Sequence, residues 1–228
     1  MSDLPGPPDT YTGDVSPGGP PAVRRLGAAT VHKLSVSEQD NNAYLVTCTR
    51  TGQALLVDAA DDAPALLALA EEAGARLTHV VTTHSHWDHH RALREVAAAT
   101  SAQTSCGAED ARDLPLAPDR TWRHGDVLEV GDLRLDVVAL RGHTPGSIAL
   151  VLSDDAGLLH VFTGDSLFPG GVGNTGSDPA RFASLLGDVE SRLFDVLPDS
   201  TWVYPGHGKD TTLGRERPHL PQWRQRGW

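Results

Sequence analysis

Several features that define particular classes of protein are scarce in this chain of 228 residues. It has two cysteines, Cys48 and Cys106, too few for a disulfide scaffold or a four-thiolate zinc site, and we expect both to be small core residues. No apolar run approaches the roughly 20 residues of a membrane-spanning helix. Basic residues are also in the minority, since 19 Lys and Arg stand against 30 Asp and Glu, a net charge of -11. We therefore expect neither a nucleic-acid nor a membrane partner.

Proline and glycine are concentrated at the start of the chain. Residues 1–22 offer no periodic apolar face and are predicted to form a flexible or surface-draped tail, and residues 23–228 a single domain. The first residues lack the basic and apolar segments of an export signal, so a cytoplasmic location is expected.

The rest of the chain alternates between strand-like and helix-like patterns. Period-two alternation predicts a meander of three strands with a turn at Thr51-Gly52, and later strands follow one by one. Helical spacing predicts three helices, and Asp178 followed by Pro179 is typical of a helix start. The predicted strands are Ala29–Ser35, Ala43–Cys48, Ala54–Val57, Leu77–Thr82, Leu133–Leu140, Ser147–Leu152 and Leu158–Phe162, with a short run at Thr201–Tyr204, and the predicted helices are Asp62–Ala73, His90–Ala99 and Asp178–Leu197.

The densest chemical signal is the string His84-Ser85-His86-Trp87-Asp88-His89, directly after a predicted strand. Residues two apart in an extended stretch point to the same side, so His84 and His86 can aim two imidazoles at one point. Asp88 and His89 follow where the chain turns, so their side chains can point to a second position a few ångströms from the first. Imidazole and carboxylate groups together are ligands for zinc or iron.

Three further ligand-type side chains stand at the ends of other predicted strands. His143, Asp165 and His207 each lie in a glycine-containing turn, where the backbone turns tightly and comes close to its neighbours. Each turn alone is a weak signal. Their repeated position after strands predicts one shared site at an edge of the sheets.

This set of residues closely resembles the metallo-β-lactamase superfamily, over the chain from about Ala29 to His207. The resemblance implies an α/β fold, a four-layer αβ/βα sandwich with a dinuclear metal site at its edge. It implies that His84, His86 and His143 hold the first metal, that Asp88, His89 and His207 hold the second, and that Asp165 bridges them. Two divalent ions are thus expected, zinc first, with iron or manganese as alternatives. Asp58 resembles an aspartate that supports the metal loops, although it also fits a strand-terminating or helix-capping role.

The strings Asn41–Val46, Gly142–Ser147 and Phe162–Phe168 look most like the glyoxalase II branch, which hydrolyses thioesters. Two features depart from that branch: the chain ends about 20 residues after His207, and Asn174 stands where relatives often carry an arginine. The resemblance implies a metallo-hydrolase that acts on a small acyl-thiol by a metal-bridging hydroxide, with Asp88 and Asp165 fixing the catalytic geometry. A lactone is an alternative substrate.

A mononuclear iron persulfide dioxygenase shares this fold and is the competing function, with His84, His143 and Asp165 as its ligands. A non-catalytic relic that binds a metal or a partner is the third alternative. Phe168, Asn174 and Lys209 are candidates for the substrate wall, and Trp87 fits either that wall or a cover over the start of the next helix. His90 is expected to point away from the site. The scattered histidines are expected to be packed or solvated: His32, His79, His124, His160 and His219.

Overall fold

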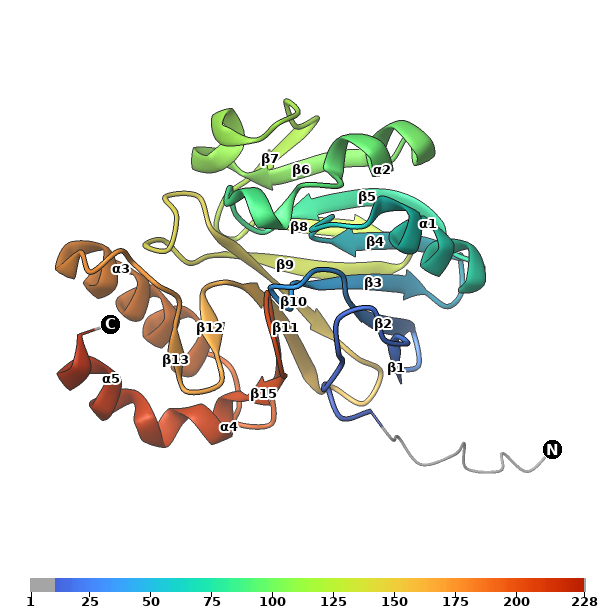
Figure 1. The fold of residues 1–228 in the computed structure, drawn as a ribbon. Helices are drawn as coiled ribbons and strands as arrows, with labels where there is room; N and C mark the ends of the chain where they lie inside the picture. The colour runs from blue at the N-terminus through green and yellow to red at the C-terminus, as the bar shows by residue number, and fades with distance from the viewer. Residues whose placement is uncertain (1–10, 228) are drawn as a thin grey trace, which may run out of the picture.

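Two β-sheets packed face to face form the centre of the molecule in the computed structural model, which describes residues 11–227 (Figure 1). The first sheet has seven strands in sequence order, antiparallel from β1 to β4 and parallel from β4 to β7. Its strands are β1 (Ala22–Arg25), β2 (Ala29–Ser35), β3 (Asn42–Cys48), β4 (Gln53–Val57), β5 (Arg76–Thr82), β6 (Gln103–Gly107) and β7 (Arg120–Trp122).

The second sheet has six strands in the order β15-β14-β11-β10-β9-β8. Its pairs are antiparallel except β11 and β14, which run parallel. The strands are β8 (Val127–Val130), β9 (Leu133–Ala139), β10 (Ile148–Ser153), β11 (Leu159–Gly164), β14 (Trp202–Pro205) and β15 (Thr211–Thr212), and a separate hairpin joins β12 (Leu167–Phe168) to β13 (Gly171–Val172).

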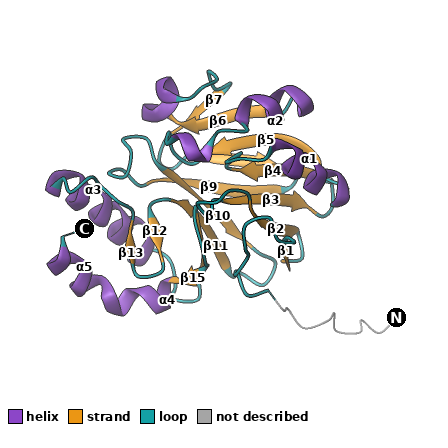
Figure 2. Ribbon diagram, viewed as in Figure 1, coloured by secondary structure: helices purple, strands orange, loops and turns teal. Residues whose placement is uncertain are grey.

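Helices cover the outer face of each sheet (Figure 2). α1 (Ala63–Glu72) and α2 (Leu93–Thr100) pack on the first sheet through one apolar cluster, and α3 (Pro179–Val189), α4 (Leu213–Glu216) and α5 (Leu220–Arg226) pack on the second through another. A third cluster fills the space between the sheets. This α/β/β/α layering confirms the predicted four-layer sandwich. Short helical turns complete the chain: η1 (Trp87–His89), η2 (Ala108–Asp113), the π-helix η3 (Glu190–Phe194) and η4 (Arg217–His219).

Most predicted elements are present, and the differences have physical reasons. Asp178 begins α3 as expected, with its carboxylate accepting from the backbone of Ala180 and Arg181. The long predicted helix ends in a π-helical turn, and the helix predicted from His90 begins at Leu93, because Trp87–His89 forms a separate 3₁₀ turn. The sequence patterns did not predict β1, β6, β7, β8, α4 and α5, or the two-residue strands β12, β13 and β15, because these elements are short and carry little periodic apolar pattern.

The Pro/Gly-rich start of the chain lies partly outside the described residues, since residues 1–10 are not among them. From Tyr11 onward the segment contacts the domain: the Tyr11 hydroxyl donates to Asp210 Oδ2 at 2.7 Å, and the carbonyl of Gly13 accepts from Lys33 Nζ at 2.7 Å. Over residues 11–227, no helix combines the length and hydropathy needed to cross a membrane.

Candidate metal centre

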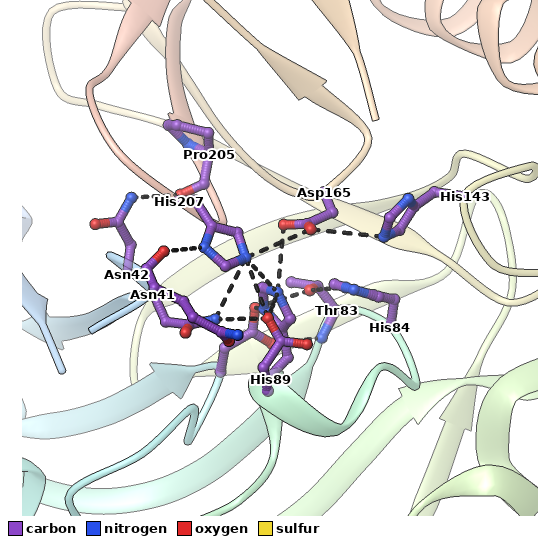
Figure 3. Close-up of polar contacts among 12 residues, drawn as sticks. Asn41, Asn42, Thr83, His84, His89, His143, Asp165, Pro205 and His207 are labelled. Atoms are coloured by element: carbon purple, nitrogen blue, oxygen red, sulfur yellow. Dashed lines mark hydrogen bonds and ion pairs between the residues drawn. The ribbon is translucent and has the colours of Figure 1, made fainter. Parts of the chain in front are cut away.

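The seven predicted ligand side chains meet at one edge of the two sheets. His84 and His86 follow β5, and Asp88 and His89 lie in η1. From the second sheet, His143 lies in the loop between β9 and β10, Asp165 directly follows β11, and His207 follows β14. Because β11 and β14 are parallel neighbours, their carboxyl ends bring Asp165 and His207 together. Figure 3 shows Asp165 between His143 and His207.

Three histidines form the first half of this cluster. The rings of His84 and His86 have centroids 4.9 Å apart, and the ring of His143 lies 4.8 Å from that of His84 and 4.4 Å from that of His86. One nitrogen from each ring lies within 4.8 Å of the others, close enough to share one ion. His84 and His143 are buried, and His86 is exposed.

The second half comprises Asp88, His89 and His207. His207 Nε2 lies 3.3 Å from Asp88 Oδ2 and 3.1 Å from His89 Nε2, and these three side chains also offer ligand atoms within 4.8 Å of one another. Asp165 stands between the halves, with Oδ1 at 3.3 Å from His89 Nε2 and Oδ2 at 3.5 Å from His143 Nε2. A further group, His84, His89 and Asp165, shares members with both.

Two of the histidines are oriented by hydrogen bonds from Nδ1 to backbone carbonyls. His143 Nδ1 donates to the carbonyl of Asn174 at 2.7 Å, and His207 Nδ1 donates to the carbonyl of Gln39 at 2.8 Å. Each bond fixes the proton on Nδ1 and leaves the lone pair on Nε2. The Nε2 atoms of His84 and His143 and Oδ1 of Asp165 are buried without a hydrogen-bond partner. Because a buried polar atom without a partner is costly, these three atoms fit a metal ion between them.

The charge states of the cluster suit the same chemistry. Burial lowers the pKa of His84 and of His143, so both rings stay neutral, as ligands must be. Burial also opposes protonation of His89, but the carboxylates of Asp165 and Asp58 outweigh it and raise the pKa of His89 to about 10. A metal bound at Nε2 of His89 would displace that proton.

Asp58 supports the loop that carries the histidine string. Its carboxylate accepts from the backbone N–H of Thr83 at 2.7 Å, from the Thr83 hydroxyl at 2.8 Å and from His89 Nδ1 at 2.9 Å. Since the Thr83 hydroxyl donates to Asp58, its oxygen is free to accept from His84 Nδ1 at 3.1 Å. Asp58 therefore orients two of the candidate ligands.

Asp110, in η2, is a residue of the site that sequence reasoning missed. This fully buried carboxylate accepts from Ser85 N at 2.8 Å, from the Thr144 hydroxyl at 2.6 Å and from Gly146 N at 2.6 Å. It thus ties the turn between His84 and His86 to the turn that follows His143. Its partners lie 25 to 36 residues away along the chain, and no local motif marks it.

Glycine is required where the backbone comes close to the cluster. A Cβ added to Gly206 would collide with Asp165 Oδ1 and with the ring of His89. The glycine before His207 therefore lets β14 deliver that histidine against the other ligands.

The other residues singled out from the sequence have separate positions. The Phe168 ring lies 6.4 Å from that of His207, whereas Asn174 reaches His143 through its backbone carbonyl. Lys209 is exposed and pairs with Asp14 at 2.8 Å. His90 Nε2 bonds the carbonyl of Ser85 at 3.1 Å and takes no part in the cluster. Within residues 11–227, the candidate ion-binding groups contain none of the scattered histidines, His32, His79, His124, His160 and His219.

Comparison with known proteins agrees with this architecture. The family described as "Metallo-beta-lactamase superfamily" matches residues 36–207. A hydroxyacylglutathione hydrolase from Rhodospirillum rubrum is 36% identical over 184 residues, which are 80% of this chain and 67% of the relative. This chain spans about two thirds or less of the length of such curated relatives.

Two solved structures are similar in fold and sequence. ETHE1 from Myxococcus xanthus superposes with a TM-score of 0.74 at 33% identity, covering 84% of this chain and 83% of that one. TTHA1623, solved in a di-iron-bound form, gives a TM-score of 0.66 at 32% identity, covering 81% and 96%. The sandwich, the cluster at its edge and the match over residues 36–207 lead to one conclusion: the chain belongs to the metallo-beta-lactamase superfamily.

Proposed function

We propose that this protein is a metal-dependent hydrolase that cleaves the thioester bond of a small hydroxyacyl-thiol. The observation that carries the proposal is the set of three buried, unpartnered atoms, His84 Nε2, His143 Nε2 and Asp165 Oδ1, in a cluster of imidazoles and carboxylates. The names of the similar curated proteins, hydroxyacylglutathione hydrolases, support the choice of bond.

We assign His84, His86 and His143 to one metal ion and Asp88, His89 and His207 to a second, with Asp165 between them. Nitrogen and oxygen donors suit zinc, with iron or manganese as alternatives, and the di-iron form of TTHA1623 shows that a similar fold can hold two irons. When bound, two divalent ions supply a water with a pKa near neutrality and a positive charge that polarises the substrate carbonyl.

The carboxylates fix the geometry of the attack. Asp165 faces both halves of the cluster, and Asp88 is held by the Asn41 amide, whose Nδ2 donates to Asp88 Oδ2 at 3.0 Å. The water oxygen adds to the thioester carbonyl carbon, and the C–S bond breaks with its electron pair on sulfur. A carboxylate, a thiol and one proton result. A thiol with a pKa of about 8.5 leaves readily as the anion, so the reaction needs no dedicated general acid.

Replacing Asp165 tests the assignment directly. Because this carboxylate links both halves, Asp165→Ala should lose bound metal and hydrolysis together. Elemental analysis and the release of free thiol from a hydroxyacyl thioester measure the two effects. The exposed Asp155→Ala is the matched control and should keep both. Turnover that survives in Asp165→Ala at the wild-type rate would refute the role of Asp165.

The competing functions give different results in the same assays. A mononuclear iron persulfide dioxygenase requires one iron per chain and consumes oxygen with a thiol persulfide. The second group, Asp88, His89 and His207, would then have no metal to hold, although its ligand atoms lie within 4.8 Å of one another. A lactone hydrolase would release acid from lactones faster than thiol from thioesters. The cytoplasmic location stays a prediction.

A further inference from the structure

A cavity of about 950 Å³ opens beside the candidate metal centre. Its walls come from the N-terminal segment at Pro17–Gly19, the loop between β2 and β3, the start of α1, and the side chains of Trp87 and Arg91. This volume lies in the range of pockets that enclose whole small-molecule ligands, and it is far larger than a short acyl group requires.

Residues of the cavity lining adjoin candidate ligands of the metal centre. Trp87 lies between the candidate ligands His86 and Asp88, and the carbonyl of Gln39 holds His207 Nδ1 at 2.8 Å. Arg91 donates to the Asn41 side chain at 3.4 Å, and Asn41 in turn donates to Asp88. The cavity therefore borders the segments that carry His86, Asp88 and His207, within reach of the far end of a substrate whose carbonyl lies at the metal centre.

Trp87 gives this cavity an aromatic surface. The indole is 58% exposed, which is unusual for so large an apolar side chain, and the Arg91 guanidinium lies 4.4 Å from its ring centre. The exposed part of the ring offers a platform for an apolar chain or for a cationic group, since the face of an indole attracts positive charge.

The charged groups that line the cavity are mainly acidic. Glu38, Asp61 and Asp62 contribute three carboxylates, against one guanidinium, that of Arg91. Arg91 is already paired, with Nη1 at 2.8 Å from Asp61 Oδ2. The lining thus carries a net charge of about -2, which disfavours an anionic ligand by direct repulsion.

We propose that this cavity binds the thiol-bearing half of the thioester and selects carriers that are neutral or cationic over carriers that are anionic. The inference rests on the proposed thioester hydrolysis and adds to it a class of substrate. It sets this chain apart from the relatives named for glutathione, a thiol with two carboxylates and one ammonium group.

A series of three thioesters that share one 2-hydroxyacyl group and differ in the thiol carrier tests the charge preference. The carriers are thiocholine, which is cationic, N-acetylcysteamine, which is neutral, and 2-mercaptoethanesulfonate, which is anionic. The measured quantity is the ratio of kcat/KM for the cationic ester to that for the anionic ester. Comparing this ratio between variants removes the different intrinsic reactivities of the three leaving groups.

Glu38→Lys reverses one charge of the lining at an exposed position. We expect it to lower the cationic-to-anionic ratio by about ten-fold or more, and by less in high salt because exposed charges are screened. The matched control is Glu129→Lys, an exposed position on β8 outside the cavity lining, which changes the net charge of the protein equally and should keep the ratio within about two-fold.

Trp87→Leu tests the aromatic platform in the same assay. Loss of the indole should raise KM for all three esters about three-fold or more with kcat little changed, because the interaction is equal in the ground and transition states. Trp87→Phe should recover part of the loss, and elemental analysis should find the same metal content in both variants.

The outcomes separate the two proposals. If the esters are hydrolysed but Glu38→Lys and Glu129→Lys give the same ratio, the cavity does not select the carrier and the inference is wrong. If KM is unchanged in Trp87→Leu, the carrier does not contact the indole, which also contradicts it. If no thioester of the series is hydrolysed by the metal-loaded wild-type protein, the proposed function itself is wrong, and the inference fails with it.

Discussion

At the scale of single residues, buried carboxylates outside the ligand set hold the candidate ligands in place. Asp58 bonds Thr83 and His89, and Asp110 bonds Ser85, Thr144 and Gly146. Residues that hydrogen-bond to metal ligands fix the orientation and the protonation of the imidazoles. Replacing such a residue therefore weakens metal binding although every ligand is still present.

Asp110→Asn tests this support. The amide keeps one acceptor oxygen but turns an NH₂ group toward buried donors, so at least one buried N–H loses its acceptor, at a cost of about 1–3 kcal/mol. We expect the free energy of unfolding, measured with urea on the metal-free protein, to fall by that amount. Metal affinity, measured by titration of the same protein, should fall as well.

Asp113→Asn is the control for Asp110→Asn, because Asp113 lies in the same turn, η2, with an exposed side chain. It should change neither quantity. An Asp110→Asn protein with wild-type metal affinity would show that the two turns hold their positions without this carboxylate.

The candidate ligands could be singled out from the sequence, whereas Asp110 could not. His84, His86, Asp88 and His89 lie in one short string, and their spacing alone carries chemical meaning. Asp110 acts through contacts between segments distant along the chain, and only the packing of η2 against two loops brings its donors together.

At the scale of elements, α3 braces the loop that carries His143. Arg181 on this helix donates to the carbonyls of Gly142 and His143, the first at 2.8 Å. From the same helix, Asp188 accepts from the backbone N–H of Arg141 at 3.0 Å and from its Nε at 2.8 Å. The helix predicted from its apolar stripe thus also has polar side chains that contact the loop carrying the candidate ligand His143.

The Asp188 contacts predict a pH dependence of stability. Burial raises the pKa of Asp188, but the hydrogen bonds from Arg141 and the nearby Arg192 outweigh it, and the net pKa is lowered. A carboxyl whose folded-state pKa lies below its unfolded value of about 3.9 stabilises the fold above that pH. The stabilisation is lost as the pH falls through the folded-state pKa.

Asp188→Asn should therefore be less stable than the wild type at pH 7, and the difference should shrink as the pH falls below about 4. Urea unfolding at a series of pH values measures it. Asp195→Asn, an exposed neighbour in the chain, should follow the wild type throughout. A constant difference between Asp188→Asn and wild type at every pH would show that ionisation of Asp188 does not contribute.

At the scale of the whole molecule, a buried ion pair joins distant parts of the chain. Lys33 Nζ on β2 donates to Asp210 Oδ1 at 2.6 Å, to the carbonyl of Gly208 at 2.6 Å and to the carbonyl of Gly13 at 2.7 Å. Asp210 also accepts from Tyr11 and Trp202. The network links the N-terminal segment, the first sheet and the turn that contains His207.

Burial works against both charges, lowering the pKa of Lys33 and raising that of Asp210, so each depends on the other. Lys33→Met should lower the free energy of unfolding by about 3–5 kcal/mol, because it leaves a buried carboxylate without its cation. The double variant Lys33→Met/Asp210→Asn should cost less than the sum of the two single changes, as contacting residues do in a double-mutant cycle. Additive costs would mean that the two charges do not interact in the folded protein.

The sequence predicts those parts of the molecule that depend on local patterns, and it does not predict those that depend on contacts between segments far apart in the chain. The strands around Val46, Val137 and Val161 and the ligand turns carry local patterns, and the resemblance they support implied the sandwich. The short strand β6, the edge strands β7 and β8 and the terminal helix α5 form because neighbouring strands pair with them or a sheet face packs against them. The burial of Lys33 likewise depends on distant partners, because no local pattern in the sequence marks this lysine, which is fully buried in the fold.

Stepwise metal reconstitution tests the central claim, a site for two ions serving thioester hydrolysis, most directly. Metal-free protein is titrated with Zn²⁺, and with Fe²⁺ or Mn²⁺ in parallel, while bound metal and thiol release from a hydroxyacyl thioester are followed together. We expect the hydrolysis rate to reach its plateau at two bound ions per chain. Full activity at one ion per chain, or in metal-free protein, would contradict it.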